Sequence, residues 1–518
     1  MFVGISELER LVILAGIWAL RAITPISFLH LVLSTSHSYS LRGYYLITSY
    51  TLIEVLFYLF FFLPRKAFLQ KPAVHPPPLS PEDREQLFSR CLAHLKDAQS
   101  FNQWFLDCPS RVPRQNVLEW LKWGFFAGEP CVNDRCSKHD EELEEYLGQL
   151  EHALGEKFPP GYDPKLKSIR ITLDDVVVYH RPVVWYLVVC IVDTISSAIL
   201  KHHGFIHFSA PVPVFPPRLH TLFSPRSPSP VLSYWYKPGT SKQPTPLLFL
   251  HGIGIGLFPY VPLLIAYSKV HPDAGILVPE FLNISGRITR PPLSPRQFQS
   301  ALGTIFHYHQ ITSYNLAGHS YGTGLSSILI RSTAQSLQPL IPKPSSVTLL
   351  DPIPILLHLP SVARNFLYRK PKNANEHEIY FFACTDLGVA HSLARHFFWT
   401  ECVLWKEDLG SLQPDELENE GSGVSKPRVA IVLSGEDIIV DSPAIWTYLT
   451  NTSPPILQTA EPRPFVPPAS HPDAFIPTIC EGGNIEAYYL GGLDHAQMFL
   501  RGESWKGLIR VIDRVSRS

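Results

Sequence analysis

Residues 314–324 read YNLAGHSYGTG, a short apolar run followed by a serine with a glycine two positions away on each side. The apolar run predicts a buried strand, and the small residues after Ser320 predict the start of a helix. A sharp turn between the two requires Gly318 and Gly322, because a side chain at either flank would clash. The pattern therefore places Ser320 at a nucleophile elbow, where the helix N-terminus favours developing negative charge.

Similar apolar runs surround this stretch in the C-terminal half of the chain, each followed by a turn and a helical segment. They cover residues 247–250, 275–278, 346–350, 429–433 and 485–490. Strands that alternate with helices predict an α/β fold with a mostly parallel sheet covered on both faces.

Two later segments supply the partners that a nucleophilic serine needs. Asp437 follows the run 429–433, and His495 follows the run 485–490. The imidazole can take the Ser320 proton, and the carboxylate can hold the imidazole tautomer and stabilise the imidazolium. The chain order serine, aspartate, histidine is the one expected for a serine on a strand–turn–helix elbow. We predict that these three residues are catalytic.

Other acidic and basic residues stand near these positions. Asp351 ends the run 346–350, and Glu436 precedes Asp437 in the same turn. Both are alternative acids, and we expect Asp437 because it lies just beyond a late strand. His319 lies inside the elbow and is expected to pack beside it.

The segment 251–256 reads HGIGIG and directly follows a predicted strand. A dinucleotide-binding loop needs the spacing G-x-G-x-x-G, which is absent here, so we expect no cofactor. We interpret the segment as an oxyanion loop that begins His251-Gly252. The Ile253 N–H would be one donor to the substrate oxygen and the Tyr321 N–H the other.

The N-terminal part of the 518-residue chain is apolar enough to meet a membrane. Residues 44–63 are long enough to span a bilayer. Glu54 within them costs about 3 kcal/mol, whereas the twelve Leu, Ile, Val and Phe residues contribute about 4–7 kcal/mol in favour of insertion. Glu54 is expected to mark a contact with a neighbouring helix. Residues 11–33, interrupted by Arg21 and Pro25, are either a second span or an interfacial helix.

The charges flanking the apolar stretch suggest an orientation. Arg65, Lys66 and Lys71 follow it, and Arg42 alone precedes it. The positive-inside rule then places the rest of the chain on the cytosolic side of a membrane. A third apolar run, residues 183–200, is either another membrane contact or a helix buried against the core.

These features divide the chain into three predicted regions. Residues 1–70 are a membrane anchor of one or two transmembrane helices, and residues 71–230 are a helical region. Residues 231–518 form the catalytic domain. Within the helical region we expect helices over 82–155, a strand over 169–178 and a proline-rich linker over 211–230. Within the catalytic domain we expect a helical lid at about 353–427 and a proline-rich surface loop at 454–477.

The net charge and the cysteine spacing argue against nucleic acid and metal as partners. The net charge of −1 gives no basic face for nucleic acid. Cys131 and Cys136 lie close in sequence to His139 but lack a fourth ligand, so we expect no metal. The sequence indicates membrane lipid and an apolar small molecule as partners and identifies no protein partner.

The elbow, the His-Gly loop and the ordered triad resemble the α/β-hydrolase superfamily over residues 231–518. The whole chain more loosely resembles fungal membrane-anchored members with no known substrate, in the segments NVLEWLKW (116–123), DPIP (351–354) and RHFFW (395–399). The resemblance implies a serine hydrolase that cleaves a carboxylic ester, lipid-like or otherwise apolar, through an acyl-enzyme. Acyl transfer by the same triad and a non-catalytic membrane scaffold are the alternatives.

Overall fold

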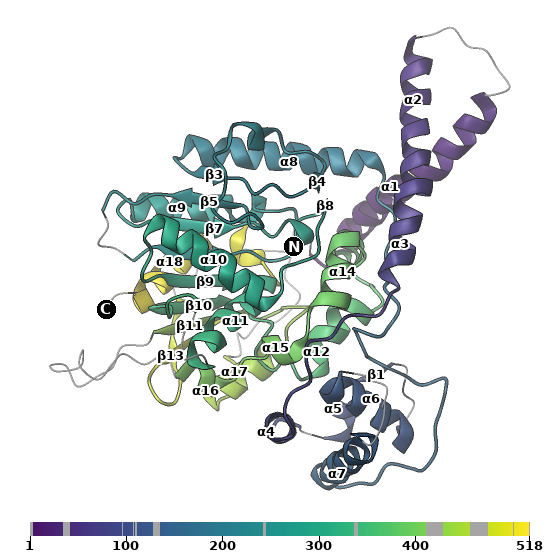
Figure 1. The fold of residues 1–518 in the computed structure, drawn as a ribbon, viewed down its shortest axis with the longest axis vertical. Helices are drawn as coiled ribbons and strands as arrows, with labels where there is room; N and C mark the ends of the chain where they lie inside the picture. The colour runs from purple at the N-terminus through teal and green to yellow at the C-terminus, as the bar shows by residue number, and fades with distance from the viewer. Residues whose placement is uncertain are drawn as a thin grey trace.

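The computed structural model describes residues 4–34, 42–95, 97–106, 108, 111–127, 135–241, 245–335, 340–410, 428–455, 475–500 and 502–516. A nine-stranded sheet forms the centre of the molecule (Figure 1). Its order is β12 (Thr478–Ile479), β13 (Ile485–Leu490), β11 (Val429–Ser434), β10 (Ser346–Leu350), β9 (Asn315–His319), β6 (Leu247–Leu250), β7 (Ile276–Pro279), β5 (Tyr234–Lys237) and β3 (Ile206–Phe208). The strands from β13 to β7 are parallel, and β12, β5 and β3 are antiparallel to their neighbours.

The predicted mostly parallel sheet is confirmed, and helices pack on both of its faces. One face holds α9 (Val261–Val270) and α18 (Gly502–Ser516), whose apolar residues share one buried core. The other holds α10 (Pro295–His309), α11 (Tyr321–Gln335) and α17 (Ser442–Thr450) around a second core. The parallel strands are buried throughout, as expected for a sheet covered on both sides.

A separate helical unit, here called the cap, precedes the sheet in the chain. It contains α4 (Pro81–Leu92), α5 (Ala98–Asn102), α6 (Arg114–Phe126) and α7 (Arg135–Leu154), with the short pair β1 (Phe105–Leu106) and β2 (Lys167–Ser168). These elements enclose their own aromatic core. The helices expected over 82–155 are therefore present.

The insert after β10 is helical where it is described. It contains α12 (Pro360–Ala363), η5 (Arg364–Tyr368), α13 (Ala374–Ile379), η6 (Tyr380–Cys384), α14 (Leu387–His396), α15 (Trp399–Cys402) and α16 (Lys406–Gly410). This segment, here called the lid, contacts the cap through a hydrogen bond from Trp399 Nε1 to Gly124 O at 3.1 Å and an ion pair between Arg90 and Glu407 at 2.5 Å. Residues 411–427 of the predicted lid, and 456–474 of the predicted surface loop, lie outside the described residues.

Two local predictions are wrong. Residues 169–178 form no strand, because side chains bind their backbone: Gln70 bonds both the N–H and the C=O of Val176, and Arg395 donates to Thr172 O and Asp174 O. Residues 211–230 are more than a linker. They contain β4 (Val214–Phe215), which pairs with β8 (Ile288–Thr289), and the 3₁₀ turn η2 (Leu219–Phe223).

The main sheet also begins earlier than residue 231. Strand β3 pairs with β5 and follows α8 (Val183–His202) directly. Strand β5 pairs with β7 on one side, and without β3 its other side would be an open edge of the sheet. Strand β3 covers that edge, so residues before 231 belong to the sheet.

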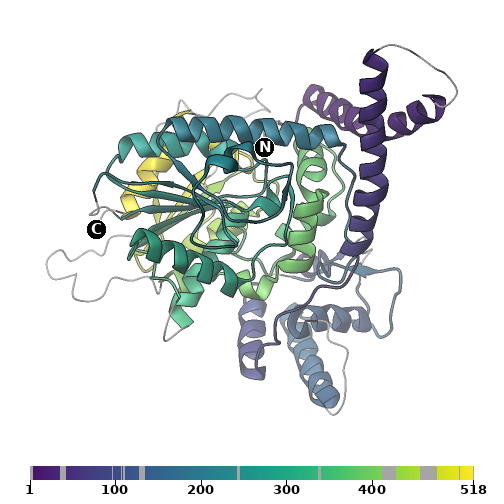
Figure 2. The ribbon, with the colours of Figure 1, turned by 45° about the horizontal axis from the view of Figure 1, so that its top comes forward.

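Among the described residues, three helices are long and apolar enough to cross a membrane, judged by length and composition: Glu7–Ser34, Tyr45–Leu69 and Val183–His202. The first is α1, and the second joins α2 (Arg42–Phe57), η1 (Tyr58–Phe62) and α3 (Leu63–Leu69). Parts of α1 and α2 project from the body, whereas α8 lies along it (Figures 1 and 2).

Candidate active site

Ser320 occupies a sharp turn between β9 and α11. Its φ of 51° lies in the left-handed region, a conformation that costs a non-glycine residue about 1–3 kcal/mol. The Ser320 N–H donates to Leu350 O at 3.0 Å, which fastens the turn to β10. A Cβ on Gly318 would collide with Ser326 Oγ, and one on Gly322 would collide with Leu250 O. Both glycines are therefore needed for the turn, as the sequence indicated.

Three side chains from three different loops meet at this turn. His495 Nε2 lies 2.9 Å from Ser320 Oγ, and His495 Nδ1 lies 2.7 Å from Asp437 Oδ2. Because β9, β11 and β13 are parallel, the loops after them lie at one edge of the sheet. A tautomer with the proton on Nδ1 donates to Asp437 and leaves Nε2 to accept the Ser320 hydroxyl proton.

The Asp437 carboxylate is fixed from its other side. Its Oδ1 accepts the N–H groups of Ile439 at 2.7 Å and Val440 at 2.9 Å. This leaves Oδ2 for the imidazole of His495. The turn after β11 thus orients the carboxylate, which in turn orients the histidine.

The alternative acid Asp351 is close to the same imidazole but not bonded to it. Its Oδ2 lies 3.9 Å from His495 Nδ1. The carboxylate instead accepts the Ser434 N–H at 2.8 Å and the Ala496 N–H at 2.9 Å. The other alternative, Glu436, is exposed to solvent. The geometry therefore favours Asp437 as the partner of His495.

Charge around the imidazole favours its protonated form. Burial opposes protonation, but the Asp437 carboxylate and then Asp351 outweigh it, so the pKa of His495 is raised. Burial likewise opposes ionisation of Asp351, and the neighbouring His319 and His495 overcome it, so the pKa of Asp351 is lowered. The imidazolium that forms during catalysis would be stabilised by both carboxylates.

The loop after β6 faces the elbow. The Gly252 N–H donates to Tyr260 Oη at 3.0 Å, and the Gly254 N–H donates to Ile284 O at 3.1 Å. These bonds anchor the residues on both sides of Ile253. A Cβ on Gly252 would come within 3.0 Å of the Ser320 Cβ, so the backbone approaches the elbow closely only because this residue is glycine. Ile253, Ser320 and Tyr321 all line one cavity.

His251, which opens this loop, is a structural residue. It is buried, and its Nε2 accepts the Phe281 N–H at 3.0 Å. Burial lowers the pKa of His251 to about 4. Its neutral ring ties the start of the oxyanion loop to the segment after β7.

A second set of contacts was not visible in the sequence. Tyr260 Oη, which accepts the Gly252 N–H, lies 2.8 Å from His319 Nδ1, whereas His319 Nε2 lies 3.7 Å from Asp351 Oδ2, beyond hydrogen-bond distance. Burial lowers the pKa of His319 to about 4, so the ring is neutral at physiological pH. Tyr260 therefore connects the loop after β6 to the elbow. Nothing in its sequence context signals this role.

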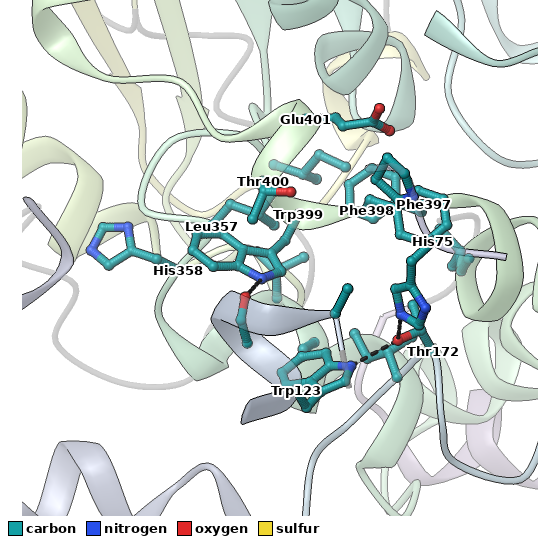
Figure 3. Close-up of a pocket in the computed structure, with 18 of the residues that line it drawn as sticks. His75, Trp123, Thr172, Leu357, His358, Phe397, Phe398, Trp399, Thr400 and Glu401 are labelled. Carbon is teal, nitrogen blue, oxygen red and sulfur yellow. Dashed lines mark hydrogen bonds between the residues drawn. The ribbon is translucent and has the colours of Figure 1, made fainter. Parts of the chain in front are cut away.

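The cavity in front of Ser320 has a volume of about 480 Å³, within the range of small-molecule sites. Figure 3 shows side chains of the cap and the lid arranged around it. The cap contributes Trp104, Trp120, Trp123 and Phe125, and the lid contributes Phe397, Phe398 and Trp399. The segment before α4 contributes His75 and residues 76–79. The three cap tryptophans pack in the cap core and line the cavity as well.

Hydrogen bonds hold several of these lining residues in place. Thr172 Oγ1 accepts from Trp123 Nε1 at 2.8 Å and also contacts His75 Nε2 at 2.8 Å (Figure 3). Of the polar groups in the wall, His358 has a pKa lowered to about 3 by burial, and burial raises the pKa of Glu401. Burial therefore favours the neutral form of both side chains.

One group in the described part of the chain has the spacing of a metal site. The ligand atoms of Asp351, Asp437 and His495 lie within 4.8 Å of one another. The Nδ1 of His495 is already hydrogen-bonded to Asp437, and its Nε2 faces Ser320. This arrangement suits proton transfer. Cys131 lies outside the described residues, as does the side chain of Cys136.

The strand order, the elbow after β9, and the acid and histidine after β11 and β13 are those of an α/β-hydrolase core. The predicted fold class is therefore confirmed.

No family model and no curated protein matches the sequence. A solved bacterial membrane phospholipase A is 12% identical with a TM-score of 0.37, over 65% of this chain and 94% of that one. Carboxylesterase CesB from Bacillus subtilis is 12% identical with a TM-score of 0.36, over 64% and 98%. The 2-hydroxy-6-oxo-6-phenylhexa-2,4-dienoate hydrolase of Rhodococcus is 12% identical with a TM-score of 0.34, over 56% and 96%. Likeness at these scores carries no argument about activity.

Proposed function

We propose that this protein is a serine hydrolase that cleaves a carboxylic ester with an apolar acyl group at a membrane surface. The observation that supports this proposal most strongly is the hydrogen-bonded chain from Ser320 through His495 to Asp437, which opens into the cavity under the cap and the lid. A buried serine in strained backbone geometry, bonded to an oriented histidine, is the arrangement expected of an activated nucleophile.

In the first half of the reaction Ser320 Oγ attacks the ester carbonyl carbon, and its proton passes to His495 Nε2. The carbonyl oxygen becomes an oxyanion that accepts the N–H groups of Ile253 and Tyr321. The tetrahedral intermediate then breaks its bond to the alcohol oxygen. That oxygen leaves with the proton from His495, and the acyl group stays on Ser320.

In the second half a water molecule attacks the acyl carbon. His495 takes one proton from the water, and the bond between the acyl group and Ser320 Oγ breaks. The proton returns to Ser320, and the carboxylic acid leaves. Throughout, Asp437 keeps the imidazole in the required tautomer and stabilises its positive charge.

The proposed substrate class follows from the walls of the cavity. Apolar side chains, among them indole and phenyl rings of the cap and lid, provide most of the surface of the cavity that Ser320 lines. Such walls favour an acyl chain or another hydrophobic group. The apolar helices α1 and α2 would hold the enzyme where such esters are concentrated.

A fluorophosphonate probe tests the proposal, because it reacts with an activated serine. The wild type is expected to be labelled and to hydrolyse p-nitrophenyl esters, whereas Ser320→Ala is expected to do neither. Ser327→Ala is the matched control. This buried serine on α11 bonds only Gly324 O among the described residues, so its variant should keep both activities. Full ester hydrolysis by Ser320→Ala would refute the proposal.

Product analysis in the presence of added alcohol distinguishes hydrolysis from acyl transfer. Free acid as the main product supports the hydrolase. A new ester as the main product, lost in Ser320→Ala, would show that the same triad transfers the acyl group to an alcohol instead of water.

A further inference from the structure

Helix α8 exposes aliphatic side chains on its outer face, while two of its serines are buried on its inner face. The side chains of Leu187, Ile191 and Ile195 are 47–56% exposed. Together with Val188 and Ile199 they form one stripe along the helix. Ser196 and Ser197 are buried. A helix on the surface of a water-soluble domain has the opposite arrangement. The outer face of α8 is therefore suited to an apolar environment.

The inner face of α8 fixes the helix to the body of the protein. Asp193 forms ion pairs with Arg218 and Arg287, each at 3.0 Å, and Arg218 also pairs with Glu280 at 2.5 Å. Ser197 Oγ lies 3.1 Å from His220 Nδ1. Removing one partner of a buried ion pair is strongly destabilising, because the remaining charge is left buried without compensation. Helix α8 therefore stays on the sheet and does not leave it to cross a bilayer.

The turn η2 beside α8 presents further apolar side chains. Leu222 is 76% exposed and Phe223 is 87% exposed. Arg218, whose ion pairs tie it to Asp193 and Glu280, immediately precedes this turn. The two apolar side chains therefore stand on a fixed support and project into the surroundings.

The helices α1 and α2 are joined to the body of the protein at the Glu54 side chain. Glu54, within the predicted span, accepts hydrogen bonds from Thr24 Oγ1, His180 Nε2 and the Val183 N–H, each at 2.7 Å. It therefore joins α1, α2 and the start of α8 at one point, and the expected contact with a neighbouring helix is present. Beyond Glu54, Phe62 and Leu69 of the continuation of α2 are buried against Leu387, Ala390 and Ala394 of the lid helix α14.

Apolar residues of α2 and its continuation are exposed on both sides of Glu54. Leu46 and Ile53 before it are 75% and 55% exposed, and Phe60 after it is 74% exposed. In Figures 1 and 2 the projecting end of α2 extends past α8.

From these relationships we infer that α8 and η2 lie against the lipid bilayer into which α1 and α2 insert, with their exposed apolar side chains toward the acyl chains. The lipid surface is the occupant because this face is continuous with the apolar helices: the Phe57 ring of α2 contacts the rings of Tyr186 of α8 and Phe215 of β4.

Depth-dependent fluorescence quenching tests this arrangement in the full chain. An environment-sensitive fluorescent amino acid replaces Leu46, Ile195 or Phe223, all of which are exposed apolar residues. Each labelled protein is then reconstituted in phosphatidylcholine vesicles. Nitroxide lipids carry the quencher either near the headgroup or near the end of the acyl chain. Ile479 is the matched control, because it is an exposed aliphatic residue on β12, at the opposite edge of the sheet from β3.

We expect the nitroxide lipids to quench the probes at Ile195 and Phe223, as they quench the probe at Leu46 in the inserted helices. Neither nitroxide should quench the probe at Ile479. Probes at Ile195 and Phe223 that behave like the one at Ile479, while the Leu46 probe is quenched, would show that another protein surface, such as a second copy of this chain, covers α8. That result overturns the inference, and it does not depend on whether Ser320 is catalytic.

Discussion

The Oδ2 of Asp351 lies 3.9 Å from His495 Nδ1, whereas the Oδ2 of Asp437 lies 2.7 Å from the same atom. Two carboxylates therefore face one side of the imidazole, and one of them is hydrogen-bonded to it. Asp351 is held by Ser434 and Ala496 and contributes its charge. The division of roles between the two acids can be measured.

Asp437→Asn should lower kcat on a soluble ester by about 10⁴-fold, because the amide would hold the imidazole in the wrong tautomer. Asp351→Asn should cause a much smaller loss, because it removes a nearby charge but not the hydrogen bond to Nδ1. Steady-state kinetics on both variants checks this, with circular dichroism to confirm folding. A large loss in Asp351→Asn with near-normal activity in Asp437→Asn would make Asp351 the acid.

The pH dependence should report the His495 pKa. Only the neutral imidazole can accept the Ser320 proton, so activity falls as the pH drops through this pKa. The pKa of His495 is raised, so the acidic limb of kcat/KM should have its midpoint above about 6.5, the ordinary histidine value. In Asp351→Asn the midpoint should move to lower pH, because one of the charges that raise this pKa is gone. An unchanged midpoint in that variant would contradict the electrostatic role of Asp351.

Tyr260→Phe tests the support of the oxyanion loop. The change removes the acceptor of the Gly252 N–H and the partner of His319 Nδ1. An unsatisfied buried donor costs about 1–3 kcal/mol, so we expect kcat to fall by about tenfold or more with little change in KM. Tyr267→Phe is the control, since Tyr267 is a buried tyrosine on α9, the helix that begins directly after Tyr260. Equal losses in both variants would point to a general effect on packing.

The meeting of Ser320, Asp437 and His495 could be predicted from the sequence because each residue is marked by a local pattern. Gly318, Ser320 and Gly322 lie within five residues, and Asp437 and His495 each follow an apolar run that forms a strand. Tyr260 and the tryptophans of the cap were missed for the opposite reason. Their contacts join segments far apart in the chain, so no local pattern announces them.

The same limit applies to the apolar helices. The composition of residues 183–200 was compatible with a membrane contact and with burial, and the structure shows one face of α8 buried and the other exposed. The sequence could not decide between them because the buried face is held by ion pairs from distant residues, among them Arg218 and Glu280. Likewise, the cost assigned to Glu54 in a bilayer does not arise at its actual site, where three donors surround it.

Phe397→Ala tests whether the lid sets acyl preference. Phe397 lines the cavity, and its ring centroid lies 6.2 Å from that of Tyr321 next to the nucleophile. Its removal should shift kcat/KM among esters of increasing acyl length, since each methylene in an apolar pocket is worth about 1–3 kcal/mol. Phe382→Ala is the control, because this lid residue packs on Trp185 and does not line the cavity. An acyl-length profile identical to that of the wild type would exclude Phe397 as a determinant.

Phe223→Glu, combined with Leu222→Glu, should separate activity at a membrane from activity in solution. Both side chains are far from Ser320 in the chain and highly exposed, so the charges should leave the fold and the hydrolysis of a soluble short-chain ester unchanged. On an ester embedded in vesicles, the apparent KM should rise while kcat at saturating vesicle concentration stays the same. The reason is that two carboxylates in the interface oppose contact with the acyl chains. Ile479→Glu should change neither assay. An unchanged KM for the vesicle-bound ester in the double variant would mean that η2 does not touch the lipid.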